Sequence, residues 1–122
     1  GVGSYPNVHE GPHQIRMEWR PAPLVPGTTV TDEPGLYLSG RFGVRTENML
    51  MVKDYMETEF GRFLEFEPLT LCPIDKTPII ASMLTDEERA WLDDYHRRVY
   101  EKLAPHLQPD ECRWLEDACS PL

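Results

Sequence analysis

The sequence predicts an α+β fold, because the expected strands come first along the chain and the expected helices come last. Runs that are rich in β-branched residues or alternate between apolar and polar residues fill the part before residue 72. A helix-capping pattern and apolar residues at helical spacing follow after residue 84. Strands and helices that are segregated in this way are typical of α+β proteins rather than of alternating α/β proteins.

The first strand is predicted at Thr28–Glu33, a segment rich in β-branched residues. It follows the turn residues Pro26 and Gly27, and Pro34-Gly35 should end it. A short extended piece is also expected at Gln14–Trp19, where apolar residues alternate with polar ones.

Two further strands are predicted at Phe42–Val52 and Phe63–Leu71. In the first of them, apolar residues fall on one face and charged residues on the other. Pro68 interrupts the second and indicates an edge or a bulge. The charged stretch Asp54–Gly61 is expected to be a loop or a turn.

Two helices are predicted at the end of the chain. Thr85 and Glu88 have the spacing of a capping box, so they should begin the first helix. The second should run from Pro109 to about Ala118, because proline is favoured in the first turn of a helix. Three aromatic residues of the two helices are expected in the core rather than in an interface. They are Trp91, Tyr95 and Trp114.

The composition excludes several classes of protein. Of the 122 residues, 40% are hydrophobic, which suffices for a core. The net charge of −9 argues against nucleic acid as a partner, since phosphate binding needs clustered Lys and Arg. No apolar run approaches the roughly 18 residues of a membrane span. The cysteines Cys72, Cys112 and Cys119 form no CxxC pair, which indicates a reducing, cytoplasmic location.

The segment from His9 to His13 matches the zinc-protease pattern H-E-x-x-H. That chemistry needs both histidines on one face of a helix. Gly11 and Pro12 lie inside the motif, and Pro12 opposes helical geometry there. We therefore expect two histidines in a loop rather than a zinc site.

Two carboxylates on the predicted strands form a more promising pair. Glu33 ends one strand, and Glu47 lies on the next, on the same face as Arg45. Two inward-facing carboxylates are costly to bury unless a cation neutralises them. A hard divalent metal is suited to that role, although glutamates on strands are more often solvated.

Four motifs in order resemble the aminopeptidase P (Xaa-Pro aminopeptidase) branch of the pita-bread metallopeptidases. Residues 1–12 read Gly-Val-Gly-Ser-Tyr-Pro-Asn-Val-His-Glu-Gly-Pro, and residues 31–37 read Thr-Asp-Glu-Pro-Gly-Leu-Tyr. Residues 42–48 read Phe-Gly-Val-Arg-Thr-Glu-Asn, and the stretch from residue 63 resembles the C-terminal extension of longer members. The resemblance implies the C-terminal part of a pita-bread domain, with antiparallel strands followed by two C-terminal helices.

The resemblance also implies a cytoplasmic exopeptidase that holds two divalent ions, Mn with Zn or Co as alternatives. It would remove the N-terminal residue that precedes a proline. Glu33 matches a metal ligand that assists proton transfer, and Glu47 matches the glutamate that bridges both metals. His9 matches the histidine that binds the substrate near the scissile carbonyl. Tyr37 and Arg45 match residues that orient the ligands.

Three of the five metal ligands implied by the resemblance, two Asp and one His, lie upstream in the family's pattern. We therefore expect a C-terminal fragment that binds metal partially or not at all and is inactive alone. Residues 1–61 should belong to the catalytic domain, with residues 62–122 as an extension packed on it. A homodimer is expected. The alternative is a non-catalytic α+β module that serves oligomerisation or partner binding.

Overall fold

The computed structural model describes residues 9–19 and 21–122. The chain forms two compact units, Gly1–Thr70 and Leu71–Leu122. The first contains all the strands and the second all the helices found in the described residues, so the predicted α+β order is confirmed. The prediction that residues 1–61 belong to the catalytic domain, with residues 62–122 as an extension packed on it, stays a prediction.

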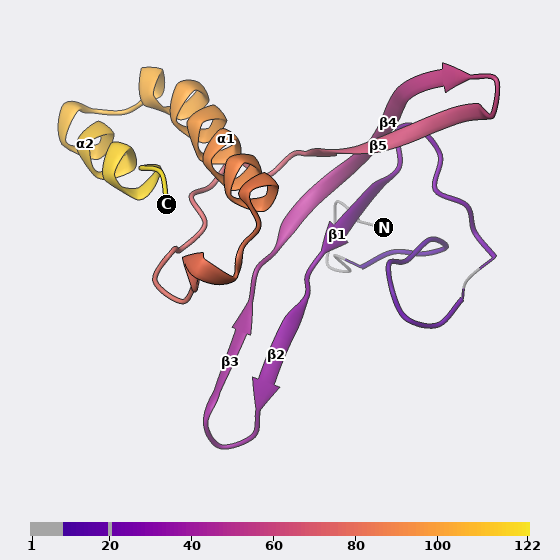
Figure 1. Cartoon of the computed structure of the whole chain (residues 1–122), viewed down its shortest axis with the longest axis horizontal. Helices are drawn as coiled ribbons and strands as arrows, with labels where there is room; N and C mark the ends of the chain where they lie inside the picture. The colour runs from indigo at the N-terminus through magenta and orange to yellow at the C-terminus, as the bar shows by residue number, and fades with distance from the viewer. Residues whose placement is uncertain (1–8, 20) are drawn as a thin grey trace. The chain divides into compact units, whose positions relative to one another are not determined.

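The first unit is built around one long hairpin, in which β1 leads into β2 and β3 leads back into β4 (Figure 1). β1, β4 and β5 form a three-stranded antiparallel sheet in the order β1-β4-β5, and β2 pairs with β3 in a two-stranded ribbon. The strands are β1 Thr29–Asp32, β2 Gly35–Leu38, β3 Phe42–Arg45, β4 Asn48–Thr58 and β5 Gly61–Pro68.

The strand predictions are partly wrong in their bounds. The first strand was expected to end at Pro34-Gly35. Instead the chain is interrupted only at residues 33–34, because β2 starts at Gly35. The strand predicted at Phe42–Val52 is divided at residues 46–47 into β3 and β4. Gln14–Trp19 forms no strand.

The charged stretch Asp54–Gly61, which we expected to be a loop, is mostly strand. Opposite charges face each other across β4 and β5, which favours strand pairing. Lys53 lies 3.3 Å from Glu65, and Arg62 forms an ion pair with Asp54. The register of the two strands shifts next to Asp54, as at a β-bulge.

The core of the first unit is small. Val30 on β1 and Val52 on β4 are its fully buried apolar residues in the described part, at 1% and 2% exposure. β1 lies at the edge of the sheet, and the segment before it contacts β1. His13 Nε2 there donates to the main-chain oxygen of Thr29, at 3.1 Å.

The second unit has the predicted helices, α1 Asp86–Leu103 and α2 Pro109–Ala118. The capping box predicted at Thr85 is present, with both of its hydrogen bonds. Two short 3-10 turns precede and follow α1, η1 Ala81–Met83 and η2 Ala104–His106. The helices share an apolar core of Leu92, Tyr95, Val99, Leu115 and Cys119.

The aromatic prediction is correct for Tyr95 and wrong for both tryptophans. Tyr95 is 3% exposed, but Trp91 is 55% exposed and Trp114 is 65% exposed. The Trp91 ring stacks on the Tyr95 ring, with 5.7 Å between the ring centres. Residues four apart on a helix lie on neighbouring turns, so Trp91 covers Tyr95 without entering the core.

The irregular segment after residue 71 is held to α1 by two consecutive side chains. The Tyr95 hydroxyl donates to the main-chain oxygen of Cys72 at 2.9 Å, and the Ile74 amide donates to His96 Nε2 at 3.0 Å. His96 is completely buried. These bonds satisfy main-chain groups of Cys72 and Ile74, which have no neighbouring strand to pair with.

In the described residues, no helix has both the length and the apolar character needed to cross a membrane.

Candidate metal centre

The site forms where the long hairpin changes from one ladder to the next. The β1–β4 pairs are separated from the β2–β3 pairs by two residues on each side of the hairpin, 33–34 and 46–47. Pro34 has no amide hydrogen, so it cannot continue the ladder. Because the gap has the same length on both strands, the register places Glu33 opposite Glu47.

Three side chains surround the carboxylate of Glu33. Thr31 donates its hydroxyl to Oε1 at 2.7 Å, and His9 Nε2 lies 3.0 Å from the same oxygen. Arg45 Nη1 lies 3.6 Å from Oε2. The hydrogen bond from Thr31 is the main reason why the pKa of Glu33 is lowered, and the charges of His9 and Arg45 add to it against partial desolvation. Glu33 is therefore held as a carboxylate.

Arg45 is shared by the two opposed carboxylates. Its Nε lies 3.2 Å from Glu47 Oε2, while its Nη1 reaches Glu33. The pKa of Arg45 is raised, first by the neighbouring Tyr37 and then by the charge of Glu47. A guanidinium in this position forms an ion pair with each carboxylate and fixes the orientation of both.

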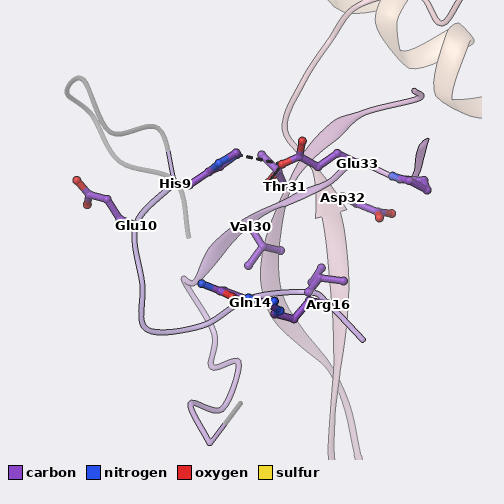
Figure 2. Close-up of a pocket in the computed structure, with 10 residues that line it drawn as sticks. His9, Glu10, Gln14, Arg16, Val30, Thr31, Asp32 and Glu33 are labelled. Atoms are coloured by element: carbon purple, nitrogen blue, oxygen red, sulfur yellow. Dashed lines mark hydrogen bonds and ion pairs between the residues drawn. The ribbon is translucent and has the colours of Figure 1, made fainter. Parts of the chain in front are cut away.

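A pocket of about 570 Å³ lies next to Glu33, between β1 and the segment before it (Figure 2). His9 points across the pocket toward Thr31 and Glu33, whereas Glu10 points away. The side chain of His9 is 70% exposed, compared with 26% for Glu33. His9 can therefore meet a ligand in the pocket without losing its contact with Glu33.

The predicted site residues thus lie together in the first unit: Glu33, Glu47, Arg45 and His9 in direct contact, with Tyr37 beside Arg45. Thr31 was missed, although it lies on β1 two residues before Glu33, a spacing that puts both side chains on one face of an extended chain. The expectation that the H-E-x-x-H match is not a zinc-protease helix is confirmed, since residues 9–13 form no helix.

The donor set suits a hard divalent cation but is incomplete. Glu33 and Glu47 offer carboxylate oxygens, which such ions prefer. Within residues 9–19 and 21–122, no group of three or more His, Cys, Asp or Glu is arranged to hold a metal. The two glutamates thus fit part of a metal centre, whose remaining ligands would have to come from elsewhere.

Comparisons with known proteins agree with this geometry. Residues 1–54 match the model of metallopeptidase family M24, and residues 62–122 match the model of the C-terminal region of peptidase M24. A protein of Laccaria bicolor named probable Xaa-Pro aminopeptidase P is 43% identical over 129 residues. Aminopeptidase P1 of Arabidopsis thaliana is 46% identical over 128 residues. Each alignment covers 100% of this chain and 20% of the relative.

A solved structure shows the same fold. It is described as an X-prolyl aminopeptidase from Caenorhabditis elegans, a cytosolic enzyme with a di-nuclear active site. It matches 100% of this chain and 20% of its own, with a TM-score of 0.86 and 38% identity. The predicted fold, the C-terminal part of a pita-bread domain, is thereby confirmed. The two glutamates facing each other across the hairpin thus lie in a chain that belongs to the metallopeptidase family M24.

Proposed function

We propose that this chain is the C-terminal part of a two-metal Xaa-Pro aminopeptidase, an enzyme that removes an N-terminal residue preceding proline. The observation that carries the proposal is the pair Glu33 and Glu47, opposed across the hairpin and joined by Arg45. The names of relatives that match the whole chain support the substrate class. The solved relative's di-nuclear site supports two ions, and we propose Mn²⁺ as the native metal.

In this proposal Glu33 and Glu47 would hold the metals, and Glu47 would serve as a ligand to both. Two bound divalent ions supply Lewis acidity and an activated water near neutral pH. Arg45 aligns the two carboxylates, because it contacts one oxygen of each. The Tyr37 hydroxyl lies over Gly35, the residue opposite Arg45, and is suited to hold Arg45 in place.

Glu33 and His9 handle protons and the substrate. Oε1 of Glu33 receives contacts from both Thr31 and His9, so a proton taken up there can be passed along hydrogen bonds that already exist. His9 lies at the exposed end of this contact and faces the pocket (Figure 2). It is suited to donate a hydrogen bond to a substrate carbonyl and to stabilise the charge that develops on it.

Three substitutions in the full-length protein test these roles. Glu47→Ala should abolish both metal retention and turnover of an Xaa-Pro peptide, while Glu33→Ala should lose one metal and most of kcat. His9→Ala should keep both metals and lose rate, because His9 is not a ligand in this proposal. Glu57→Ala is the matched control, since it removes an exposed carboxylate from the far end of β4.

Metal content by elemental mass spectrometry and release of the N-terminal residue are the measurements. Near-normal turnover with two metals in Glu47→Ala would refute the assignment. A metal-free His9→Ala variant would instead place His9 among the ligands.

A second role, in assembly, is favoured by the exposed tryptophans of the helical unit. Trp91 and Trp114 are 55% and 65% exposed, which is unusual for large aromatic residues outside interfaces. We propose that this unit contributes to a homodimer in the cytosol. Analytical ultracentrifugation of the full-length protein with and without residues 80–122 tests this proposal. If the two forms of the protein have the same oligomeric state, the proposal is contradicted.

A further inference from the structure

One face of the β2–β3 ribbon carries an unusual set of residues. Tyr37 and Gly35 lie two residues apart on β2, so they share a face. Their partners across the ribbon are Gly43 and Arg45, because Tyr37 pairs with Gly43 and Gly35 pairs with Arg45. A large aromatic residue is thus surrounded by two glycines and by the arginine of the candidate metal centre.

The Tyr37 ring occupies the space that side chains at both glycines would need. A Cβ at Gly43 would lie 2.6 Å from Cδ1 of the ring, and a Cβ at Gly35 would lie 2.7 Å from both Cε2 and the hydroxyl oxygen. Both distances are far below the roughly 3.5–4.0 Å at which carbon atoms pack favourably. The ring therefore lies flat on the backbone of both strands.

These glycines are needed for space and not for an unusual backbone. In the described residues, positive φ angles occur at Gly27, Gly40 and Gly61 and not at Gly35 or Gly43. An alanine would suit the ribbon conformation at either position. It would instead displace the aromatic ring, which is otherwise 64% exposed.

The direction of the ring matters because of what lies at its end. The hydroxyl lies over Gly35, and the residue opposite Gly35 is Arg45. The hydroxyl is thus brought beside Arg45, whose guanidinium reaches Glu33 and Glu47. A ring that leaves the glycines would take the hydroxyl away from Arg45, and Arg45 would lose the contact that fixes it between the two carboxylates.

We propose that Gly35 and Gly43 are positioning residues, which by lacking side chains seat the Tyr37 ring and so hold Arg45 between the metal-binding carboxylates Glu33 and Glu47. The link to metal binding rests on the function proposed above. The seating of the ring depends only on the ribbon.

The test is a double-mutant cycle in the full-length protein, with the affinity for Mn²⁺ measured by calorimetry. Gly43→Ala should weaken Mn²⁺ binding and lower kcat by about 10–100-fold each, as loss of a ligand-orienting contact does. Tyr37→Ala should have a similar effect without adding a side chain to the ribbon. In the Tyr37→Ala background, Gly43→Ala should change affinity less than about threefold, because its target is gone.

Gly40→Asn is the control. Gly40 lies in the turn of the same ribbon with open space around it, and Asn tolerates its φ of +70°. This variant should leave both affinity and kcat unchanged. If Gly43→Ala weakens Mn²⁺ binding as much in the Tyr37→Ala background as in the wild-type protein, the glycine does not act through the ring. The proposal is then overturned.

A second measurement separates this proposal from the proposed function. The ¹⁹F resonance of 3-fluorotyrosine placed at position 37 should shift in metal-free Gly43→Ala and stay in place in Gly40→Asn. An unshifted resonance in Gly43→Ala overturns the seating of the ring, whatever the metal does. A wild-type protein that binds no Mn²⁺ refutes the proposed function, while the ¹⁹F result still decides where the ring lies.

Discussion

The buried His96 should make the helical unit sensitive to mild acid. Its ring is 0% exposed, and Nε2 accepts the Ile74 amide hydrogen at 3.0 Å, so the neutral ring must carry its proton on Nδ1. Nδ1 is buried and has no partner in the described structure. Burial therefore lowers the pKa of His96 below its ordinary 6.5; Lys76 lowers it further and Asp93 opposes the shift.

The size of the effect follows from the linkage between protonation and folding. Below pH 6.5 the unfolded chain protonates this histidine while the native ring stays neutral, so stability falls as pH falls. From about pH 7.5 to about pH 5.5, His96 alone should remove at most about 1.4 kcal/mol of the free energy of unfolding. The loss is complete when the pH has passed below the native pKa.

Urea denaturation of the 122-residue chain, followed by the helical circular dichroism signal, measures this loss. The helices of the described structure all lie after residue 80, so the signal reports on the second unit. His96→Leu should abolish this part of the pH dependence. At neutral pH it should cost about 1–3 kcal/mol, since the Ile74 amide loses its acceptor.

His106→Gln is the matched control, because it removes an exposed histidine from the same unit. An equal pH dependence of stability in the wild-type chain and in His96→Leu would refute the reasoning.

Three further predictions concern the two units. Leu115→Ala should lower the free energy of unfolding by about 2–5 kcal/mol, whereas Trp114→Ala should change it by less than about 0.5 kcal/mol, because Leu115 is 1% exposed and Trp114 is 65% exposed. Thr85→Ala should cost about 1 kcal/mol in the same denaturation experiment, and Thr85→Ser, which keeps the capping hydroxyl, should cost much less. The 122-residue chain alone, incubated with Mn²⁺ and an Xaa-Pro peptide, should release no N-terminal residue, since its described part holds no group of three metal-binding side chains. Metal-dependent turnover would show that it completes a site in another way.

Local patterns were enough to predict the helical part of the chain. The capping box at Thr85 and the proline at residue 109 set the starts of α1 and α2, because these signals act within one turn of a helix. The sequence motifs also indicated the family, and they named Glu33 and Glu47 as a pair of carboxylates on strands.

Only the tertiary structure decided the bounds of the strands, because these bounds depend on which segments pair. Residues 54–58, which carry two acidic side chains, look like a loop in isolation and become strand because β5 offers opposite charge across the ladder. Strand pairing likewise makes Gly35 the start of β2. Such partners lie far apart in sequence, so local propensity cannot reveal them.

The site depends on the same non-local pairing. The sequence by itself determined which residues carry the charge and the oxygen donors. Only the register of the hairpin decided that Glu33 lies opposite Glu47, that Arg45 reaches both, and that two glycines lie beneath the Tyr37 ring. The physical reason is that a shift of one residue would turn every side chain of a strand to its other face, and the pairing that prevents this shift exists only in the folded chain.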